Sequence, residues 1–289
     1  MITTSNLGRL RAVLSNGGAR DVLAAREDLK AARIVVHATY LEEISDLLRT
    51  MGLALAMSPE VTYPRRDRCK GGWSNQFSGP EEGDPHRILY VAKSRFLSDA
   101  TAEAEALGDD ARLGQFLAIP QCCQRFYGEC AEAAAQEQGD LLPFFAPRAH
   151  QKVHPLLNLG AQYFDMAFVS HFPCSCECVA SIRLAEQQVE IVRRRDAEWA
   201  STTLQWLHRV CVYTEDEGVF LLRCLHTKDD EITYANRDIH GTALGRVNDA
   251  LAMNSVLKLG PGPTVVLGSE DGQETVLTAR NLRVLVPAA

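Results

Sequence analysis

The sequence predicts a mixed α/β (α+β) protein with an α/β first part, a helical middle that carries cysteines, and a smaller β-rich end. Up to Trp206, apolar residues recur at helical spacing between short strand-like runs; beyond it, short β-type runs alternate with turn residues. The composition, 46% apolar and 23% charged over 289 residues, is that of a globular chain able to bury a large core. We expect a domain over residues 1–205 and a β-rich subdomain over residues 206–289.

Helices and strands are expected to alternate in the first part. Residues 41–51 (LEEISDLLRTM) carry apolar residues at helical spacing, and Gly52 is a suitable helix stop. Pro120 and Pro173 suit the first turn of a helix, where a missing N–H has no partner. Helices are therefore expected at 22–32, 41–51, 98–107, 110–119, 121–138, 149–163 and 174–199. Strands are expected at 32–38, 53–57, 87–93 and 166–172.

A long connection at residues 58–85 is rich in Pro, Gly, Asp and Arg. Loops of this length are usually functional or mobile. Its basic run at 65–70 (RRDRCK) is followed by Gly71 and Gly72, and we interpret it as a solvated loop and not as a specific anion site.

Turn residues separate the expected strands of the β-rich end. The acidic turn at 214–217 and the hairpin signal Asp271-Gly272 are the clearest examples. Strands are expected at 207–213, 218–225, 231–234, 264–267, 274–278 and 282–286, and a helix at 244–253. Trp199 and Trp206 are expected to join the helical middle to this end.

The net charge of −7 and the pI near 5.7 argue against a nucleic-acid partner, because phosphate binding needs a basic face. Residues 1–15 lack the continuous apolar stretch of a secretory signal, and no run approaches the roughly 20 apolar residues of a membrane span. We therefore expect a cytoplasmic protein with reduced thiols and no membrane partner. Nine cysteines, an odd number, then favour metal or redox chemistry over a disulfide framework.

Six of the nine cysteines fall between residues 122 and 178. Cys174 and Cys178 are four residues apart after a proline, so a helix beginning there would place both thiols on one side and Cys176 on another. Cys122 and Cys123 also follow a proline closely, but neighbours on a helix diverge by about 100°. We therefore expect one of this pair to face the centre and the other to pack or take part in thiol exchange.

Helix starts favour thiolates, because unpaired N–H groups and the helix dipole stabilise negative charge there. Two such starts could converge on one cation or cluster, and His171 could add an imidazole ligand or orient another ligand. The expected metal ligands are Cys122, Cys123, His171, Cys174 and Cys178. Soft sulfur ligands point to an iron–sulfur cluster or zinc, while the lack of a C-x-x-C motif argues against a zinc ribbon.

Free cysteines are also common as small apolar fillers of a protein core, and that is the alternative for every cysteine in this chain. We assign the core role to Cys211 and Cys224, which fall in expected strands. Cys69 and Cys130 are expected to have no site role.

His150 and His154 are four residues apart, which on a helix would permit two ligands on one face. The metalloprotease pattern requires Glu after the first histidine, but this chain has Gln151, and Pro155 shortens the helix. We interpret the pair as helix-surface histidines. His37, at the end of an expected strand, is interpreted as a core histidine.

Two segments carry a resemblance to a known family. Residues 119–126 (IPQCCQRF) and 171–181 (HFPCSCECVAS) resemble two motifs, P-x-C-C-x-x-F and H-x-P-C-S-x-x-C-x-x-S, of a prokaryotic family of unknown function. Residues 85–90 (PHRILY) also resemble it, and the similarity spans roughly residues 85–200. The resemblance implies a cysteine/histidine centre with no established activity; Cys176 fills a variable position of the motif.

The overall layout is more loosely similar to the peptide-binding accessory proteins of crocagin-type ribosomal peptide pathways. That resemblance implies a protein that holds a precursor peptide for a separate enzyme.

Three functional hypotheses follow. The first is a metal- or iron–sulfur-binding protein acting in the sulfur or redox chemistry of a bacterial biosynthetic pathway. The alternative is a non-catalytic accessory protein that binds a peptide or partner protein in natural product biosynthesis. The third is thiol exchange through Cys122 and Cys123. The sequence assigns neither a reaction nor an oligomeric state.

Overall fold

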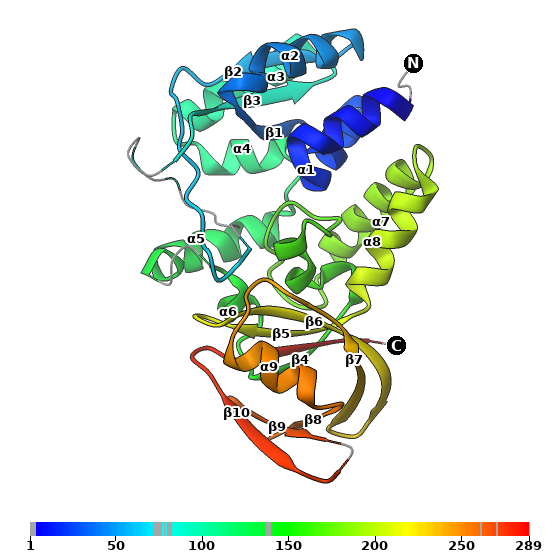
Figure 1. Cartoon of the computed structure of the whole chain (residues 1–289). Helices are drawn as coiled ribbons and strands as arrows, with labels where there is room; N and C mark the ends of the chain where they lie inside the picture. Colours follow the sequence, from blue (N-terminus) through cyan, green and yellow to red (C-terminus); the bar gives the residue numbers. More distant parts are fainter. Residues whose placement is uncertain are drawn as a thin grey trace.

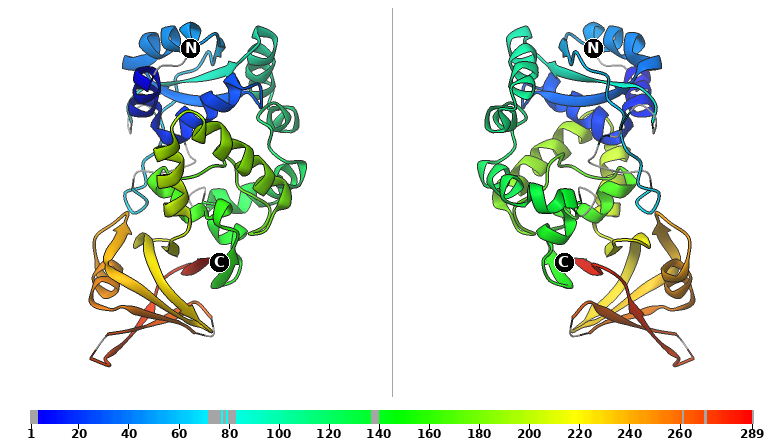
Figure 2. Two further views of the ribbon diagram at one scale, coloured as in Figure 1. Left: turned by 90° about the vertical axis from the view of Figure 1, so that its right-hand side faces the viewer. Right: turned by 90° about the vertical axis from the view of Figure 1, so that its left-hand side faces the viewer.

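The computed structural model describes residues 4–71, 77, 79, 83–136, 140–260, 262–269 and 271–288. Helices and strands are mixed along the chain, which confirms the α+β class. An N-terminal α/β region lies at one end of the molecule and a β-sheet region at the other, with a helical middle between them (Figure 1, Figure 2). Within these described residues, no helix is both long enough and apolar enough to cross a membrane.

The N-terminal region is built on an antiparallel sheet of strand order β1-β3-β2. Its strands are β1 (Ala32–His37), β2 (Ala54–Met57) and β3 (His86–Ala92). Its helices are α1 (Thr4–Arg26), α2 (Leu41–Thr50), α3 (Arg95–Ala106) and α4 (Asp110–Phe116), with the 3-10 turn η1 (Ala38–Tyr40). The central strand β3 is buried over residues 88–92, as expected for a strand covered on both faces. The expected strands and the helices α2, α3 and α4 are confirmed.

The first helix is longer than expected. α1 begins at Thr4 instead of near residue 22, and it contains a break at Ser15 (φ 66°, ψ 176°). A Ser-Asn-Gly-Gly sequence at this break obscures the helical pattern. The helix restarts because Asp165, distant in sequence, accepts the backbone N–H groups of Asn16 and Gly17.

The middle region departs from expectation in three places. Its elements are α5 (Gln121–Gln136), α6 (Leu142–Phe145), α7 (Val179–Arg193), α8 (Ala197–Leu207) and the 3-10 turns η2 (Pro155–Leu157) and η3 (Leu159–Phe164). Residues 149–163 form strand β4 (His150–Val153) and the two 3-10 turns, because Pro155 prevents a continuous helix. Residues 166–172 form no strand. Residues 174–199 are not one helix: 174–178 form a turn, and Asp196 caps a separate α8.

The β-rich end is an eight-stranded sheet of order β10-β9-β8-β7-β6-β5-β11-β4. Its later strands are β5 (Val210–Thr214), β6 (Gly218–Lys228), β7 (Glu231–Gly241), β8 (Val256–Leu259), β9 (Thr264–Gly268), β10 (Glu274–Thr278) and β11 (Arg283–Pro287), with α9 (Arg246–Met253) inserted. The expected strands, the helix and the β9–β10 hairpin are confirmed, and β8 is additional. Because β4 pairs with β11, the sheet includes one strand from before residue 205.

The two faces of this sheet pack into separate cores. Alternate residues of β5 point to opposite faces. Cys211 and Tyr213 join the core of the N-terminal and middle regions, whereas Val210 and Val212 join a core under α9. Cys211 is buried as expected, and Cys224 is partly buried against the second core. The sheet therefore closes one side of the helical middle, where the clustered cysteines lie.

Candidate metal centre

Four cysteine sulfurs meet between the start of α5 and the segment before α7. Cys122, Cys123, Cys174 and Cys178 place their Sγ atoms within 4.8 Å of one another. Cys122 Sγ lies 3.8 Å from Cys123 Sγ and 3.7 Å from Cys178 Sγ. Cys123 Sγ and Cys178 Sγ are 3.6 Å apart. The four cysteines are thus close enough to hold a metal ion.

The start of α5 delivers two adjacent cysteines to this group. The Cys123 N–H donates to Pro120 O (2.8 Å) in the first turn of the helix. Cys123 is buried, and Cys122 is exposed. The expectation that only one of the pair faces the centre is wrong. The side chains of Cys122 and Cys123 leave the helix about 100° apart. Both still contact the Cys178 sulfur, because it lies between them.

The second pair comes from a turn and not from a helix. α7 begins at Val179, and Cys178 occupies its N-cap position. The turn is closed by the Cys178 N–H, which donates to Ser175 O (3.2 Å). The Cys174 N–H donates to Cys123 Sγ (3.3 Å), so a backbone group of one segment contacts a sulfur of the other. The expected proximity of Cys174 and Cys178 is therefore confirmed, although the expected helical geometry is wrong.

Cys176 faces away from the centre, as expected, and anchors the turn to its surroundings. Its Sγ is buried 3.7 Å from Phe145 O, and burial raises the pKa of this thiol to about 12. Its carbonyl accepts the His154 N–H (2.9 Å) at the end of β4. The cysteine-bearing turn is thereby fixed to an edge of the large sheet.

His171 reaches the sulfurs through Ser181. Its Nε2 is 2.8 Å from Ser181 Oγ, and that oxygen is 3.2 Å from Cys123 Sγ. Burial, together with Lys30 and Arg20, lowers the pKa of His171 to about 3, so its ring is neutral. Ser181 is fully buried and was not among the expected site residues. Ser181 stands at the last position of the second motif that the sequence resembles, and that resemblance was the signal that could have indicated it.

Burial opposes the ionisation of Cys123, Cys174 and Cys178. It raises the pKa of Cys123 well above its usual range, and burial together with hydrogen bonds to Cys178 and Cys122 raises the pKa of Cys174 to about 11. At Cys178 burial would also raise the pKa, but hydrogen bonds involving Ser181 and the neighbouring thiols outweigh it and lower the pKa to about 7. Four thiolates at neutral pH would therefore require a cation among them, and a metal ion could supply that charge.

Buried polar groups fix the segment before the second pair to α1. Ser170 Oγ lies 2.6 Å from Asp21 Oδ1, and Lys30 Nζ lies 2.9 Å from the same oxygen. Arg20 donates to Ala167 O and to Ser170 Oγ (2.7 Å). Burial would raise the pKa of Asp21, but Lys30, Arg20 and Ser170 outweigh it and lower the pKa to about 2. The chain entering the cysteine turn is thus held by a charged network.

The other candidate histidines lie apart from the four sulfurs. His150 belongs to β4 and His154 follows it, so the expected helix-surface placement is wrong. The His150 Nε2 lies 2.9 Å from Gly260 O. His37, half-buried at the end of β1, packs against His86 with ring centroids 5.0 Å apart.

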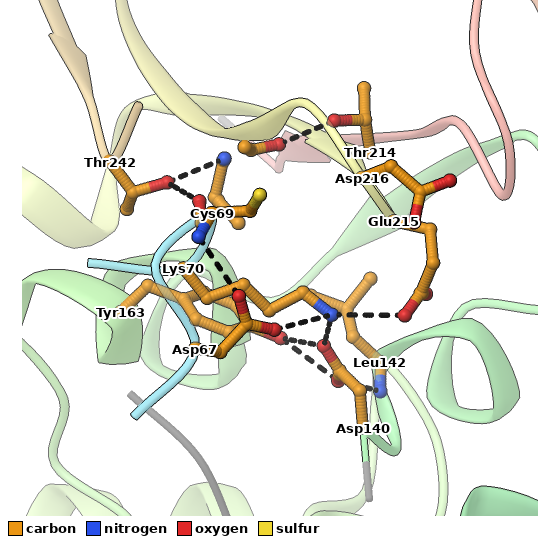
Figure 3. A network of polar contacts seen from close by, with 12 residues as sticks. Asp67, Cys69, Lys70, Asp140, Leu142, Tyr163, Thr214, Glu215, Asp216 and Thr242 are labelled. Atoms are coloured by element: carbon orange, nitrogen blue, oxygen red, sulfur yellow. Dashed lines mark hydrogen bonds and ion pairs between the residues drawn. The ribbon is translucent and has the colours of Figure 1, made fainter. Parts of the chain in front are cut away.

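The sequence analysis missed a second polar cluster, which surrounds Lys70 (Figure 3). Lys70 is 1% exposed, and its Nζ lies 2.8 Å from Asp140 Oδ2 and 3.3 Å from Glu215 Oε1. The hydroxyls of Tyr163 and Tyr213 also contact Asp140 (2.8 and 2.9 Å). The interpretation of residues 65–70 as a solvated loop is therefore wrong for Lys70. Its partners come from far along the chain, so no local pattern indicated the burial.

Comparison with known proteins gives no family: no family model, curated protein or solved structure matches this chain. The motif resemblances stay predictions, and the candidate centre is supported by its own geometry.

Proposed function

We propose that the chain is a metal-binding protein whose centre is a single zinc ion held by four thiolates. The ligands are Cys122, Cys123, Cys174 and Cys178. The observation that supports this proposal is the spacing of the sulfurs, 3.6 to 3.8 Å for the three pairs among Cys122, Cys123 and Cys178.

The spacing fits one ion better than a cluster. Zinc binds thiolates at about 2.3 Å with tetrahedral geometry, which gives a sulfur–sulfur edge of about 3.8 Å. In a four-iron cluster each cysteine binds a different iron atom, so the width of the cluster separates the cysteine sulfurs. Tetrahedral coordination by four sulfurs is found for zinc and for iron, so it is the short sulfur–sulfur spacing that favours a single ion. We therefore place zinc ahead of an iron–sulfur cluster.

Four protein ligands would fill the coordination sphere of zinc and leave no position for a bound water. Such an ion contributes folding free energy. Here it would clamp the first turn of α5 to the turn before α7. His171 orients Ser181 and so supports the ligand Cys123 from outside the four sulfurs.

Metal analysis of protein purified without oxygen tests the proposal. About one zinc ion per chain is expected, and Cys178→Ser should lose most of it. Cys130→Ser, on the same helix as the first pair, is the matched control and should retain the metal. Iron with labile sulfide in place of zinc would contradict the single-ion geometry, and fully folded, metal-free protein would contradict metal binding itself.

We infer a second candidate function, peptide binding, from the end of the large sheet. β10 is the last strand in the sheet order, and Val276 on it is 62% exposed. Such an edge can accept an extended peptide as an additional strand. Calorimetry against candidate precursor peptides would give micromolar or tighter affinity that Val276→Lys weakens and Cys178→Ser does not. Affinity that disappears with the metal would contradict this second candidate.

A further inference from the structure

Solvent access distinguishes one sulfur of the centre from the other three. Cys122 is exposed, whereas Cys123 and Cys178 are 1% and 6% exposed and Cys174 is half-buried. Of the four residues, Cys122 is therefore the one most open to a dissolved electrophile.

Hydrogen bonding separates Cys122 and Cys174 from the other two ligands. Cys123 Sγ accepts the Cys174 N–H (3.3 Å) and lies 3.2 Å from Ser181 Oγ. Cys178 is hydrogen-bonded by the side chain and backbone of Ser181. Cys122, by contrast, has the other sulfurs as its polar neighbours. Donated hydrogen bonds withdraw electron density from a thiolate, which leaves Cys122 and Cys174 as the more nucleophilic sulfurs. Of these two residues Cys122 is the exposed one.

We propose that Cys122 is a reactive ligand that reduces hydroperoxides, with Cys178 as the second thiolate. This inference rests on the proposed metal centre. The Cys122 thiolate attacks the terminal oxygen of a hydroperoxide, and the O–O bond breaks. The products are a sulfenic acid on Cys122 and an alkoxide, or hydroxide from hydrogen peroxide, which takes a proton from water.

The Cys178 thiolate then attacks the Cys122 sulfur. The S–S bond forms, the S–O bond breaks, and hydroxide leaves to be protonated to water. Two thiolates thus supply the two electrons that reduce the hydroperoxide.

Geometry selects Cys178 over Cys123 as the second thiolate. Cys178 Sγ is 3.7 Å from Cys122 Sγ and belongs to a different segment. Cys123 Sγ is similarly close, at 3.8 Å, but adjacent residues have Cα atoms about 3.8 Å apart, below the usual disulfide range of about 4.4–6.8 Å. The disulfide removes two of the four ligands, so the metal leaves the centre and the turn before α7 is released.

The experiment uses zinc-loaded protein and equimolar hydrogen peroxide in buffer free of added thiols. Zinc release is followed with a chromogenic chelator, and disulfides are identified by peptide mass spectrometry. We expect release together with a Cys122–Cys178 disulfide. Cys122→Ser should slow the release by about tenfold or more, and Cys130→Ser, the control on the same helix, should release zinc at the wild-type rate.

A second measurement covers the case in which Cys122→Ser does not hold zinc. A dimedone-type probe added during oxidation of the wild type should label Cys122. Label at another cysteine, or zinc retained while peroxide is present, overturns this inference and leaves the metal proposal intact. Wild-type protein that carries no metal contradicts the metal proposal instead.

Discussion

The cysteine centre and the Lys70 network each join segments that lie far apart in the chain. In the network, opposite charges meet: an ammonium lies 2.8 Å from Asp140 and 3.3 Å from Glu215. In the centre, four groups of one kind meet, and ionising all of them would place four negative charges within 4.8 Å. The network therefore contains its own counter-charge, whereas a centre of four thiolates would need a cation from outside the chain.

The two sites therefore stabilise the contact between distant chain segments in different ways. Burial would lower the pKa of Lys70, but Asp140 and Glu215 outweigh it and raise the pKa. Lys70 therefore keeps its charge over the whole neutral range without any group from outside the chain. The stability that the centre contributes should depend on the supply of metal and on the redox state of its sulfurs.

Removing the metal should have the largest effect. At free zinc a thousand times the dissociation constant, binding adds about 4 kcal/mol to the free energy of unfolding. A chelator should remove this contribution from the wild type in urea unfolding and leave Cys178→Ser unaffected. Hydrogen exchange at the His154 amide, which donates to the cysteine turn, should also speed up. Identical unfolding curves with and without chelator would show that the cysteine centre, like the Lys70 network, is stable without an added cation.

Breaking the Lys70 network should cost slightly less. Lys70→Met leaves the buried Asp140 and Glu215 without a cation, which should lower the free energy of unfolding by about 3 kcal/mol. The cost comes from burying carboxylates without a cation, and it falls when acid removes their charge. The difference in the free energy of unfolding between the wild type and Lys70→Met should therefore become smaller as the pH falls from 7 towards 5. A pH-independent deficit would show that packing, not charge, supports this junction.

Wild-type stability should respond to high pH at the same site. Because the pKa of Lys70 is raised above 10.5 in the folded state, its contribution is fully present below that pH. It is lost only as the pH rises through the folded-state value.

Asp21 belongs to a third site, a charged network that holds the chain entering the cysteine turn. Losing its charge should have a smaller effect on stability than losing the metal or Lys70. Its pKa falls from 3.8 to about 2, which corresponds to about 2 kcal/mol of stability above pH 4. That contribution should disappear as the pH falls from about 4 to 2. Asp21→Asn should lack this part of the pH dependence while keeping its zinc at pH 7. Loss of zinc in this variant would mean that α1 positions the cysteines directly.

Local patterns predicted most of the secondary structure. Apolar spacing gave α2, and the run of apolar residues gave β3 within one residue at each end. The pattern failed where tertiary contacts decide the backbone. α1 continues past Ser15 because Asp165 caps its second half, and the cysteine turn is held by contacts to β4. These partners are more than a hundred residues away, or in another element, and leave no periodic signal.

The candidate site was predictable in its residues but not in its geometry. Cysteine clustering and proline placement identified the four sulfurs, whereas a helix through Cys174 and Cys178 was the wrong reason for their proximity. Lys70 was missed because a lysine beside three arginines has the pattern of a solvated loop. Burial of such a residue depends on Asp140 and Glu215, whose positions only the fold reveals.

The smallest effect should come from Ser181→Ala, which tests whether the centre has support beyond its four ligands. Ser181 Oγ lies 3.2 Å from Cys123 Sγ and 2.8 Å from His171 Nε2, so the change removes a hydrogen bond to a ligand and isolates the imidazole. Loss of such support lowers metal affinity by about tenfold. Ser175→Ala, an exposed serine in the same turn, is the control. Zinc competition titrations would measure the change in metal affinity, and the sulfur-to-cobalt absorption of cobalt-substituted protein would report on the ligand sulfurs. If Ser181 had only a structural role, Ser181→Ala would alter unfolding of the metal-free chain and leave both the affinity and the absorption unchanged.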